Sequence, residues 1–327
     1  MSFTRRFLGA AVLGASAALT LATAAIAQQD NLRIATQVSG TVNWELTTIA
    51  AQGLDKANGF TMVVQDVAAG PAAQIAFQGD QADVIVSDWL WVARMRAEGN
   101  DYVFIPYSKA VGALMVRADS PAQALTDMAG KKIGIAGGPV DKSWLILRAY
   151  AQSQGFDLQS ETEQVFGAPP LIFETALNGE TDGAINFWHF NAKAEAAGFR
   201  PLMTVSDAAL ALGLSDQTPL LGYVVKGSFL REHPEIVDGF SKASRAAKEI
   251  LAVDDTAWDS LRPIMNAKSD AQFEALKAGF RAGIPAPGPV DEASAAKMLE
   301  IMANLGGEEL MGKTTSLPEG VFIQPGS

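Results

Sequence analysis

The chain of 327 residues contains no cysteine. Without thiols it has no disulfide bond, no cysteine-ligated zinc site, no thiol nucleophile and no cysteine that could carry a lipid. Histidine is scarce too: His189 and His233 are the two copies, and they form no H-x-x-x-H pair. A G-x-S-x-G sequence is also missing. The residues therefore argue against hydrolase chemistry and indicate neither a metal site nor a cofactor.

Positive charge and long apolar runs are in short supply as well. The chain has 25 Lys and Arg against 36 Asp and Glu, and its formal net charge of −11 argues against nucleic acid as a partner. Beyond residue 27, no run reaches the roughly 18 consecutive apolar residues of a membrane-spanning helix. Apolar residues make up 48% of the chain, enough for two cores of about 100 to 200 residues each. We therefore expect two lobes.

Residues 1–27 have the pattern of a secretory signal. Arg5 and Arg6 precede an apolar run that ends in an A-x-A cleavage site at residues 25–27. A retained membrane anchor is the alternative, but the run is rich in alanine and short of bulky residues, which favours cleavage before Gln28. Cleavage would take the net charge from −11 to −13. We expect a periplasmic protein with no stable membrane insertion after cleavage; the general secretory and twin-arginine routes both stay open.

Short apolar runs alternate with helix-period segments along the rest of the chain. Strands are expected at residues 32–35, 61–64, 82–86, 131–136, 162–166, 183–187 and 221–225. Helices are expected at 43–58, 72–78, 142–154, 228–232, 234–251, 256–265, 270–281 and 291–305. This alternation predicts an α/β fold in which each lobe is a mainly parallel sheet flanked by helices.

Residues 79–89 and 179–188 resemble each other. In both segments a helix ends on glycine, a short acidic turn follows, and a strand runs into a tryptophan. The resemblance can reflect an internal repeat of the lobes. It can equally reflect two generic turns that each connect a helix to a strand.

Tryptophan is concentrated near expected strand ends. Trp44, Trp89, Trp144 and Trp188 each follow shortly after a strand and lie at or near the first turn of a helix. In open α/β sheets ligands bind at that edge, although tryptophan is also a routine core residue. Trp91 is expected to pack against its own sheet, and Trp258 has no relation to a cleft.

The stretch GGPVDKSW, residues 137–144, follows an expected strand. Its glycines would let the backbone approach a ligand, and Asp141 can cap the following helix. Asp141 stands where a phosphate-binding P-loop needs glycine, so this stretch is not a P-loop. A ligand loop and an ordinary helix start remain equally good interpretations.

The sequence resembles the periplasmic solute-binding proteins of ABC importers, in the family that serves nitrate, taurine, alkylsulfonates and thiamine-precursor pyrimidines. The segments that carry the resemblance are residues 73–79 with 82–84, residues 130–135, and residues 222–225 with 229–235. It extends over nearly the whole chain after residue 27. It implies a two-lobe, type II-like binding-protein fold with two crossover strands and a ligand cleft between lobes that close by a hinge.

The resemblance also implies the organisation of the chain and its site. The lobes would comprise residues 28–115 and 222–327 for the first and 116–221 for the second, with crossovers near 112–117 and 221–225. Pocket roles would fall to Gln37, Ser39, Gly40, Trp44, Ser87, Asp88, Trp89, Gly138, Asp141, Lys142, Ser143, Asn186 and Trp188. We expect a monomer that passes a small-molecule solute to an ABC permease and its ATPase, with no cofactor and no catalytic activity of its own.

Two classes of solute stay open. The expected cleft is rich in tryptophan and acids and poor in arginine, which suits a planar or cationic compound sandwiched by Trp44, Trp89, Trp144 and Trp188. Helix N-termini with Lys142 could instead hold an anion such as a sulfonate or nitrate, because Asp88 and Asp141 already have expected capping roles.

Two functions other than import are compatible with such a fold. A binding protein of this kind could serve a sensor or a redox system in place of an importer. Relatives with this fold also act as enzymes of pyrimidine or menaquinone synthesis, but those work in the cytoplasm, and the pyrimidine synthases depend on a cysteine-bearing motif that is absent here.

Overall fold

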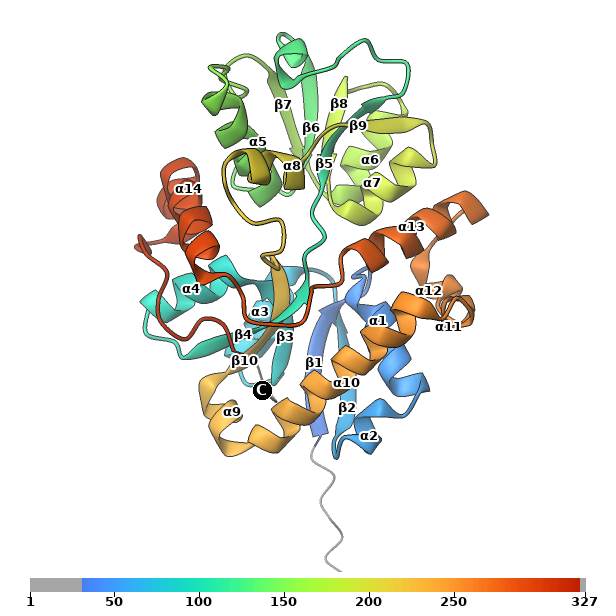
Figure 1. Cartoon of the computed structure of the whole chain (residues 1–327), viewed down its shortest axis with the longest axis vertical. Coiled ribbons are helices and arrows are strands. Elements are labelled where there is room, and N and C mark those ends of the chain that lie inside the picture. Colours follow the sequence, from blue (N-terminus) through green and yellow to red (C-terminus); the bar gives the residue numbers. More distant parts are fainter. Residues whose placement is uncertain (1–30, 324–327) are drawn as a thin grey trace, which may run out of the picture.

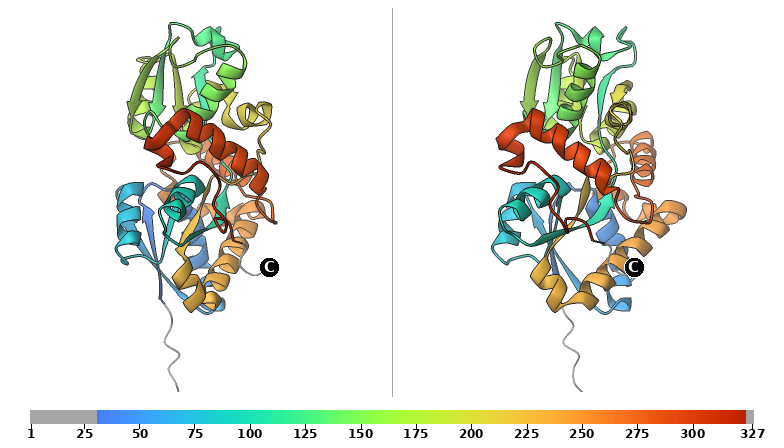
Figure 2. Two further views of the ribbon diagram at one scale, coloured as in Figure 1. Left: turned by 90° about the vertical axis from the view of Figure 1, so that its left-hand side faces the viewer. Right: turned by 60° about the vertical axis from the view of Figure 1, so that its left-hand side comes forward.

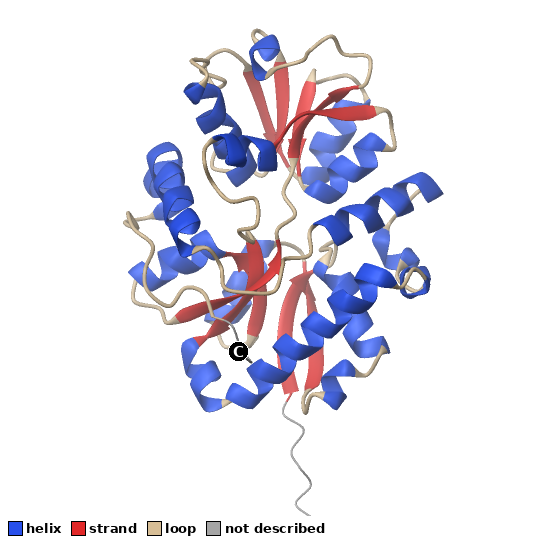
Figure 3. Cartoon of the chain, in the orientation of Figure 1, coloured by secondary structure: helices blue, strands red, loops and turns tan. Residues whose placement is uncertain are grey.

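The computed structural model describes residues 31–323, so the expected signal at residues 1–27 lies outside the described part of the chain. The described residues form two lobes, each built on a five-stranded sheet flanked by helices (Figures 1 and 3). Sheet A of lobe I contains β1 (Asn31–Gln37), β2 (Thr61–Val67), β3 (Val84–Asp88), β4 (Tyr102–Ser108) and β10 (Leu221–Lys226). Sheet B of lobe II contains β5 (Ala113–Arg117), β6 (Lys132–Ala136), β7 (Glu163–Gly167), β8 (Gly183–Asn186) and β9 (Phe199–Thr204). The expected two-lobe α/β fold is confirmed.

The two sheets have the same topology. Sheet A has the order β2-β1-β3-β10-β4, and sheet B has the order β7-β6-β8-β5-β9. In each, a single strand runs antiparallel to both neighbours: β10 in sheet A and β5 in sheet B. These are the strands that follow the two crossings between lobes, after residues 109–112 and 212–220. The lobe borders at residues 115 and 221 stay a prediction.

The similar segments at residues 79–89 and 179–188 occupy equivalent places, because each leads into the third parallel strand of its lobe. They also make the same backbone clamp. The Arg33 N–H donates to Asp83 Oδ2 at 2.9 Å and the Asp83 N–H donates to Arg33 O at 2.9 Å; Lys132 and Asp182 repeat the pair at 2.9 and 2.8 Å. The acidic turns therefore join β1 to the start of β3 in lobe I and β6 to the start of β8 in lobe II.

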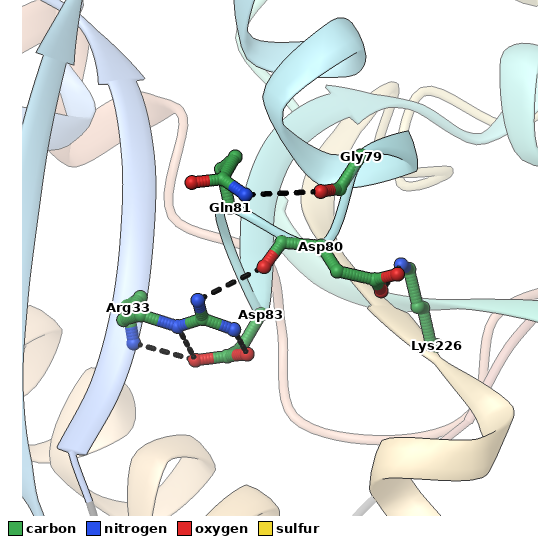
Figure 4. A network of polar contacts seen from close by, with 6 residues as sticks. All are labelled: Arg33, Gly79, Asp80, Gln81, Asp83 and Lys226. Atoms are coloured by element: carbon green, nitrogen blue, oxygen red, sulfur yellow. Dashed lines mark hydrogen bonds and ion pairs between the residues drawn. The ribbon is translucent and has the colours of Figure 1, made fainter.

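In lobe I this clamp is part of a larger polar network at the end of sheet A opposite the cleft described below (Figure 4). The Arg33 guanidinium bonds both oxygens of Asp83, at 2.9 and 2.5 Å. Asp80 adds an ion pair with Lys226 of β10. The network links β1, the start of β3 and β10. Its charged residues therefore stabilise sheet A, far from the cleft.

Helices flank both sheets. Lobe I has α1 (Val42–Ala51), α2 (Leu54–Ala57), α3 (Gly70–Gln78), α4 (Trp89–Ala97), α9 (Gly227–Glu232) and α10 (Pro234–Val253). Lobe II has the 3-10 helix η1 (Leu125–Met128) and α5 (Lys142–Ser153), α6 (Pro169–Leu177), α7 (Trp188–Glu195) and α8 (Val205–Ala211). The C-terminal segment forms α11 (Thr256–Asp259), α12 (Arg262–Met265), α13 (Asp270–Ala282) and α14 (Glu292–Met311). Among the described residues no helix is both long and apolar enough to cross a membrane.

Three sequence-based expectations need correction. The helix expected over residues 43–58 is two helices, because Gly53 adopts a left-handed conformation with φ of 64° between α1 and α2. The helix expected over 256–265 is likewise divided into α11 and α12. Strands β4 and β9 and helix α8 were not anticipated.

The last two helices connect the lobes. The aromatic residues of α13 belong to the core of lobe I, while α13 also packs along α7 of lobe II. Helix α14 packs against α5 of lobe II and α4 of lobe I, and Figure 2 shows it lying between the lobes. One continuous hydrophobic cluster includes Met298, Leu299 and Met302 of α14 and core residues of both lobes.

Candidate functional site

The lobes face each other across a cleft of about 340 Å³. Its walls come from the carboxyl ends of β1, β3 and β4 in lobe I and from the first turns of α5 and α7 in lobe II. This is the sheet edge at which open α/β folds bind ligands. Its polar and aromatic lining comprises Thr36, Gln37, Thr41, Gln74, Ser87, Asp88, Tyr107, Asp141, Lys142, Ser143, Phe187, Trp188 and His189.

The lobe I wall is fixed by local hydrogen bonds. The loop after β1 turns sharply because the Gly40 N–H donates to Gln37 O at 2.9 Å. Asn43 Nδ2 donates to Gln37 O and Val38 O at 2.8 and 3.1 Å, so Asn43 holds this loop while Thr41 is the N-cap of α1. Gln74 Nε2 of α3 donates to Ser87 Oγ at 3.3 Å. The wall thus presents amide and hydroxyl groups on a rigid frame.

A cross-cleft ion pair joins the lobes. Asp88 ends β3 and caps α4, because its Oδ1 accepts from the Trp91 N–H at 3.0 Å. Its Oδ2 lies 3.0 Å from Lys142 Nζ at the start of α5 in lobe II. Burial lowers the pKa of Lys142, but the charge of Asp88 and the hydrogen bond to it outweigh burial and leave that pKa above its usual value. Lys142 is therefore a charged side chain that already has a carboxylate partner.

Asp141 is the second carboxylate of the cleft. Its Oδ1 caps α5 by accepting from the Trp144 N–H at 3.0 Å, as the sequence predicted. Burial raises the pKa of Asp141 to about 6, although the Trp144 N–H and the charge of Lys142 act in the opposite direction. No lysine, arginine or histidine of the described residues forms an ion pair with it. Asp141 is consequently a carboxylate without a cationic partner.

Trp188 and His189 begin α7 and form the lobe II wall. The Trp188 ring contacts lobe I: it lies edge-on to Trp44 with centroids 5.9 Å apart, and it covers the α-carbon of Gly279 on α13. Burial, with a smaller effect of the Lys193 charge, lowers the pKa of His189 to about 3. The imidazole is thus neutral in the physiological range and can offer hydrogen bonds but no charge.

The expected sandwich of four tryptophans needs correction. Trp89 and Trp144 are 0% and 1% exposed and belong to the hydrophobic core. Trp44 is 4% exposed and packs between Trp188, Trp258 and Phe280. The first-turn positions were right, but these three rings are buried in packed cores, where burial of a large aromatic surface is most favourable. Of the four, Trp188 lines the cleft.

The remaining expected site residues divide in the same way. Gln37, Gly40, Ser87, Asp88, Asp141, Lys142 and Ser143 line the cleft with Trp188, whereas Ser39, Gly138 and Asn186 do not. Asn186 has both ends of its amide engaged locally, because Nδ2 donates to Pro169 O and Oδ1 accepts from the Phe187 N–H. Their part in binding a solute stays a prediction.

Tyr107 is a lining residue that the sequence did not single out. It is the last residue but one of β4, and its buried hydroxyl has the Thr41 side chain as its polar neighbour. Burial raises the pKa of Tyr107 well above its usual range, with the charge of Glu45 adding to the effect, so the hydroxyl keeps its proton. Behind the ring lies a buried ion pair, Lys248 Nζ to Glu45 Oε2 at 2.7 Å. A solute acceptor group in the cleft would compete with Thr41 for this hydroxyl donor.

A second hollow, of about 380 Å³, lies in lobe I between α10 and residues 284–288. It takes its lining from lobe I and the C-terminal segment, with no residue of lobe II. Among the described residues no group of three or more His, Asp or Glu side chains could hold a metal ion.

Comparison with known proteins agrees with this architecture. A family model described as NMT1/THI5 like matches residues 80–257, more than half of the chain. No curated protein sequence matches the chain significantly. The periplasmic aliphatic sulphonate binding protein SsuA of Escherichia coli has a similar solved structure, with a TM-score of 0.71 and 17% identity over 90% of this chain and 92% of that chain.

Two further solved structures have the same fold. The alkanesulfonate-binding protein SsuA of Xanthomonas axonopodis pv. citri, bound to MOPS, gives a TM-score of 0.68 at 15% identity, covering 90% of this chain and 98% of that chain. DszB in complex with biphenyl-2-sulfinic acid gives 0.59 at 16% identity, with the same coverage of 90% and 98%. The two SsuA proteins are described as binding proteins, and at these identities the likeness establishes the fold.

Proposed function

Because the chain belongs to the NMT1/THI5-like family, we propose that it is the periplasmic solute-binding component of an ABC importer. It captures a small organic solute between its lobes and delivers it to an inner-membrane permease and its ATPase. The observation that carries this proposal is the cleft of about 340 Å³, which takes its lining from both lobes at the carboxyl ends of their strands. A volume in this range is typical of small-molecule sites.

Solute capture would work by lobe closure. The lobes are joined through residues 109–112 and 212–220, which can act as a hinge, while Trp188 and Lys142 of lobe II reach Trp44 and Asp88 of lobe I. A ligand shifts an opening equilibrium only by its differential affinity for the two states. A solute held by both walls therefore favours the closed state. A ligand in the second hollow, between α10 and residues 284–288 and called the outer hollow of lobe I below, would not.

A thermal-shift screen combined with small-angle X-ray scattering tests this proposal on the chain from Gln28 to Ser327. A solute at about 100 times its dissociation constant should raise the free energy of unfolding by roughly 2.7 kcal/mol. The same solute should reduce the radius of gyration, because closure brings the lobes together. A solute that stabilises the protein without any change in scattering would argue against capture by closure.

Delivery to a permease is a separate step with its own test. The permease and ATPase of the proposed importer, reconstituted in liposomes with the periplasmic face outward, should hydrolyse ATP faster when the solute-loaded protein is added outside. No stimulation by the loaded protein, together with tight binding to a periplasmic sensor domain, would assign it to signalling instead of import.

A further inference from the structure

We propose that the solute carries a positively charged nitrogen, recognised by the Asp141 carboxylate and by aromatic rings of the cleft. The proposal rests on the solute-binding function above and adds the chemical class of the solute. It differs from what the names of the sulfonate-binding structural neighbours suggest, and it follows from how charge is arranged between the lobes.

The charged side chains that line the cleft are Asp88, Asp141 and Lys142. Lys142 Nζ already forms an ion pair with Asp88 Oδ2 at 3.0 Å. The side chains of this pair are partly shielded from water, with 26% of Lys142 and 14% of Asp88 exposed. Asp141 has no cationic partner among the described residues, and no arginine lines the cleft. The ionised cleft thus carries one net negative charge, which attracts a cation and repels an anion.

Aromatic rings complete the environment that an alkylammonium group prefers. Trp188 and Phe187 line the cleft from lobe II and Tyr107 lines it from lobe I. An ammonium near ring faces is stabilised by the ring quadrupole, most strongly where water is excluded. Phe187 is 40% exposed, so it lies at the rim, where it can cover an entering solute.

An anionic solute without such a nitrogen meets two obstacles. It must separate Lys142 from Asp88, leaving a poorly hydrated carboxylate without a partner, and it must approach Asp141. Helix α7 begins at the cleft without a side-chain cap, so its first N–H groups can donate to a negative group, whereas at α1 the Asn43 and Trp44 N–H groups already donate to Gly40 O and Thr41 O. A zwitterion can use both features, with its nitrogen at Asp141 and its acid group at a helix N-terminus.

Asparagine substitutions test the charge while keeping the fold, because Asn caps helices as well as Asp does. Asp141→Asn removes the unpaired carboxylate. Asp291→Asn is the matched control, since Asp291 caps α14 by the same bond, from the Ser294 N–H at 3.0 Å, and does not line the cleft. Asp88→Asn keeps the α4 cap and frees Lys142 for an anion.

The experiment is calorimetric titration of the wild type and these variants with choline, glycine betaine and ethanesulfonate. We expect choline or betaine to bind, Asp141→Asn to weaken that binding about tenfold or more, and Asp291→Asn to leave it unchanged. Ethanesulfonate should bind only after Asp88→Asn.

Tight binding of ethanesulfonate to the wild type would overturn the assignment. So would a choline or betaine affinity of Asp141→Asn equal to that of Asp291→Asn. Either result would leave the proposal of a solute-binding protein intact. If none of the three probes binds, the assignment of a cationic solute is wrong. In that case a hit in the wider thermal-shift screen would still support the solute-binding function, and the absence of any hit would argue against it.

Discussion

Gly279→Ala is a small change with a large expected effect on closure. Gly279 lies on α13 in lobe I, directly against the ring of Trp188 in lobe II. A β-carbon there would lie 2.7 Å from Cζ3 and 2.8 Å from Cε3 of the ring. The ring has little room to retreat, because its other side contacts Trp44 edge-on at 5.9 Å. An added methyl group must therefore push the lobes apart or displace Trp188.

The size of the effect on affinity depends on which state, closed or open, contains the strained contact. Overpacking of one methyl group in a well-packed contact costs about 1–3 kcal/mol. If the contact belongs to the closed state, this cost opposes ligand binding and weakens affinity about 5- to 150-fold. In the open state the same substitution is favourable by about 0.5–1 kcal/mol, because alanine replaces glycine inside a helix. Affinity should fall while the ligand-free protein keeps or gains stability.

Calorimetric titration with a hit from the thermal-shift screen gives the affinity, and thermal unfolding of the free protein gives its stability. Combining Gly279→Ala with Trp188→Phe is the control: the smaller ring relieves the clash, so the double variant should bind better than the product of the single effects. An unchanged affinity for Gly279→Ala would refute the idea that the contact between Trp188 and α13 forms on closure.

Three further outcomes are expected. Trp144→Ala should cost about 3–5 kcal/mol of stability in urea unfolding because the ring is 1% exposed in the core; a loss of affinity at unchanged stability would contradict this placement. Lys248→Met should destabilise the protein by about 3–5 kcal/mol, because the buried Glu45 keeps the hydroxyls of Tyr223 and Ser244 but loses its cationic partner; an unfolding midpoint equal to wild type would contradict this. Because the pKa of Asp141 is raised to about 6, its contribution to stability is fully present below its unfolded value near 3.8 and is lost as pH rises through about 6. Choline affinity should rise as pH passes through about 6, where the folded-state carboxyl ionises, and then level off; a flat profile from pH 5 to 8 would remove Asp141 from the site.

Local chemistry explains which parts of the site were predictable from the sequence. Asp88 and Asp141 were expected as helix caps after strands, and both accept the bond from the N–H three residues ahead. Capping depends on neighbouring residues alone, so the sequence contains it. The mainly parallel sheets were predictable for the same reason, since the alternation of apolar runs and helices is a local pattern.

Ring orientation and sheet order could not be predicted in this way. Trp89 and Trp188 both begin helices after the third parallel strand of a lobe, yet Trp89 is buried in the core and Trp188 lines the cleft. What decides between them is the packing partner, which for Trp188 is Gly279, about ninety residues further along the chain. Tyr107 reaches the cleft because β10, a strand far away in sequence, pairs beside β4.

The central claim is that a small solute binds between the lobes, and two tryptophan substitutions test it most directly. Ser143→Trp fills the cleft from α5, and Ala286→Trp fills the outer hollow of lobe I. In calorimetric titrations with the best thermal-shift hit, binding should be lost in Ser143→Trp and kept in Ala286→Trp. Binding that survives Ser143→Trp and disappears in Ala286→Trp would place the solute outside the cleft and contradict the account.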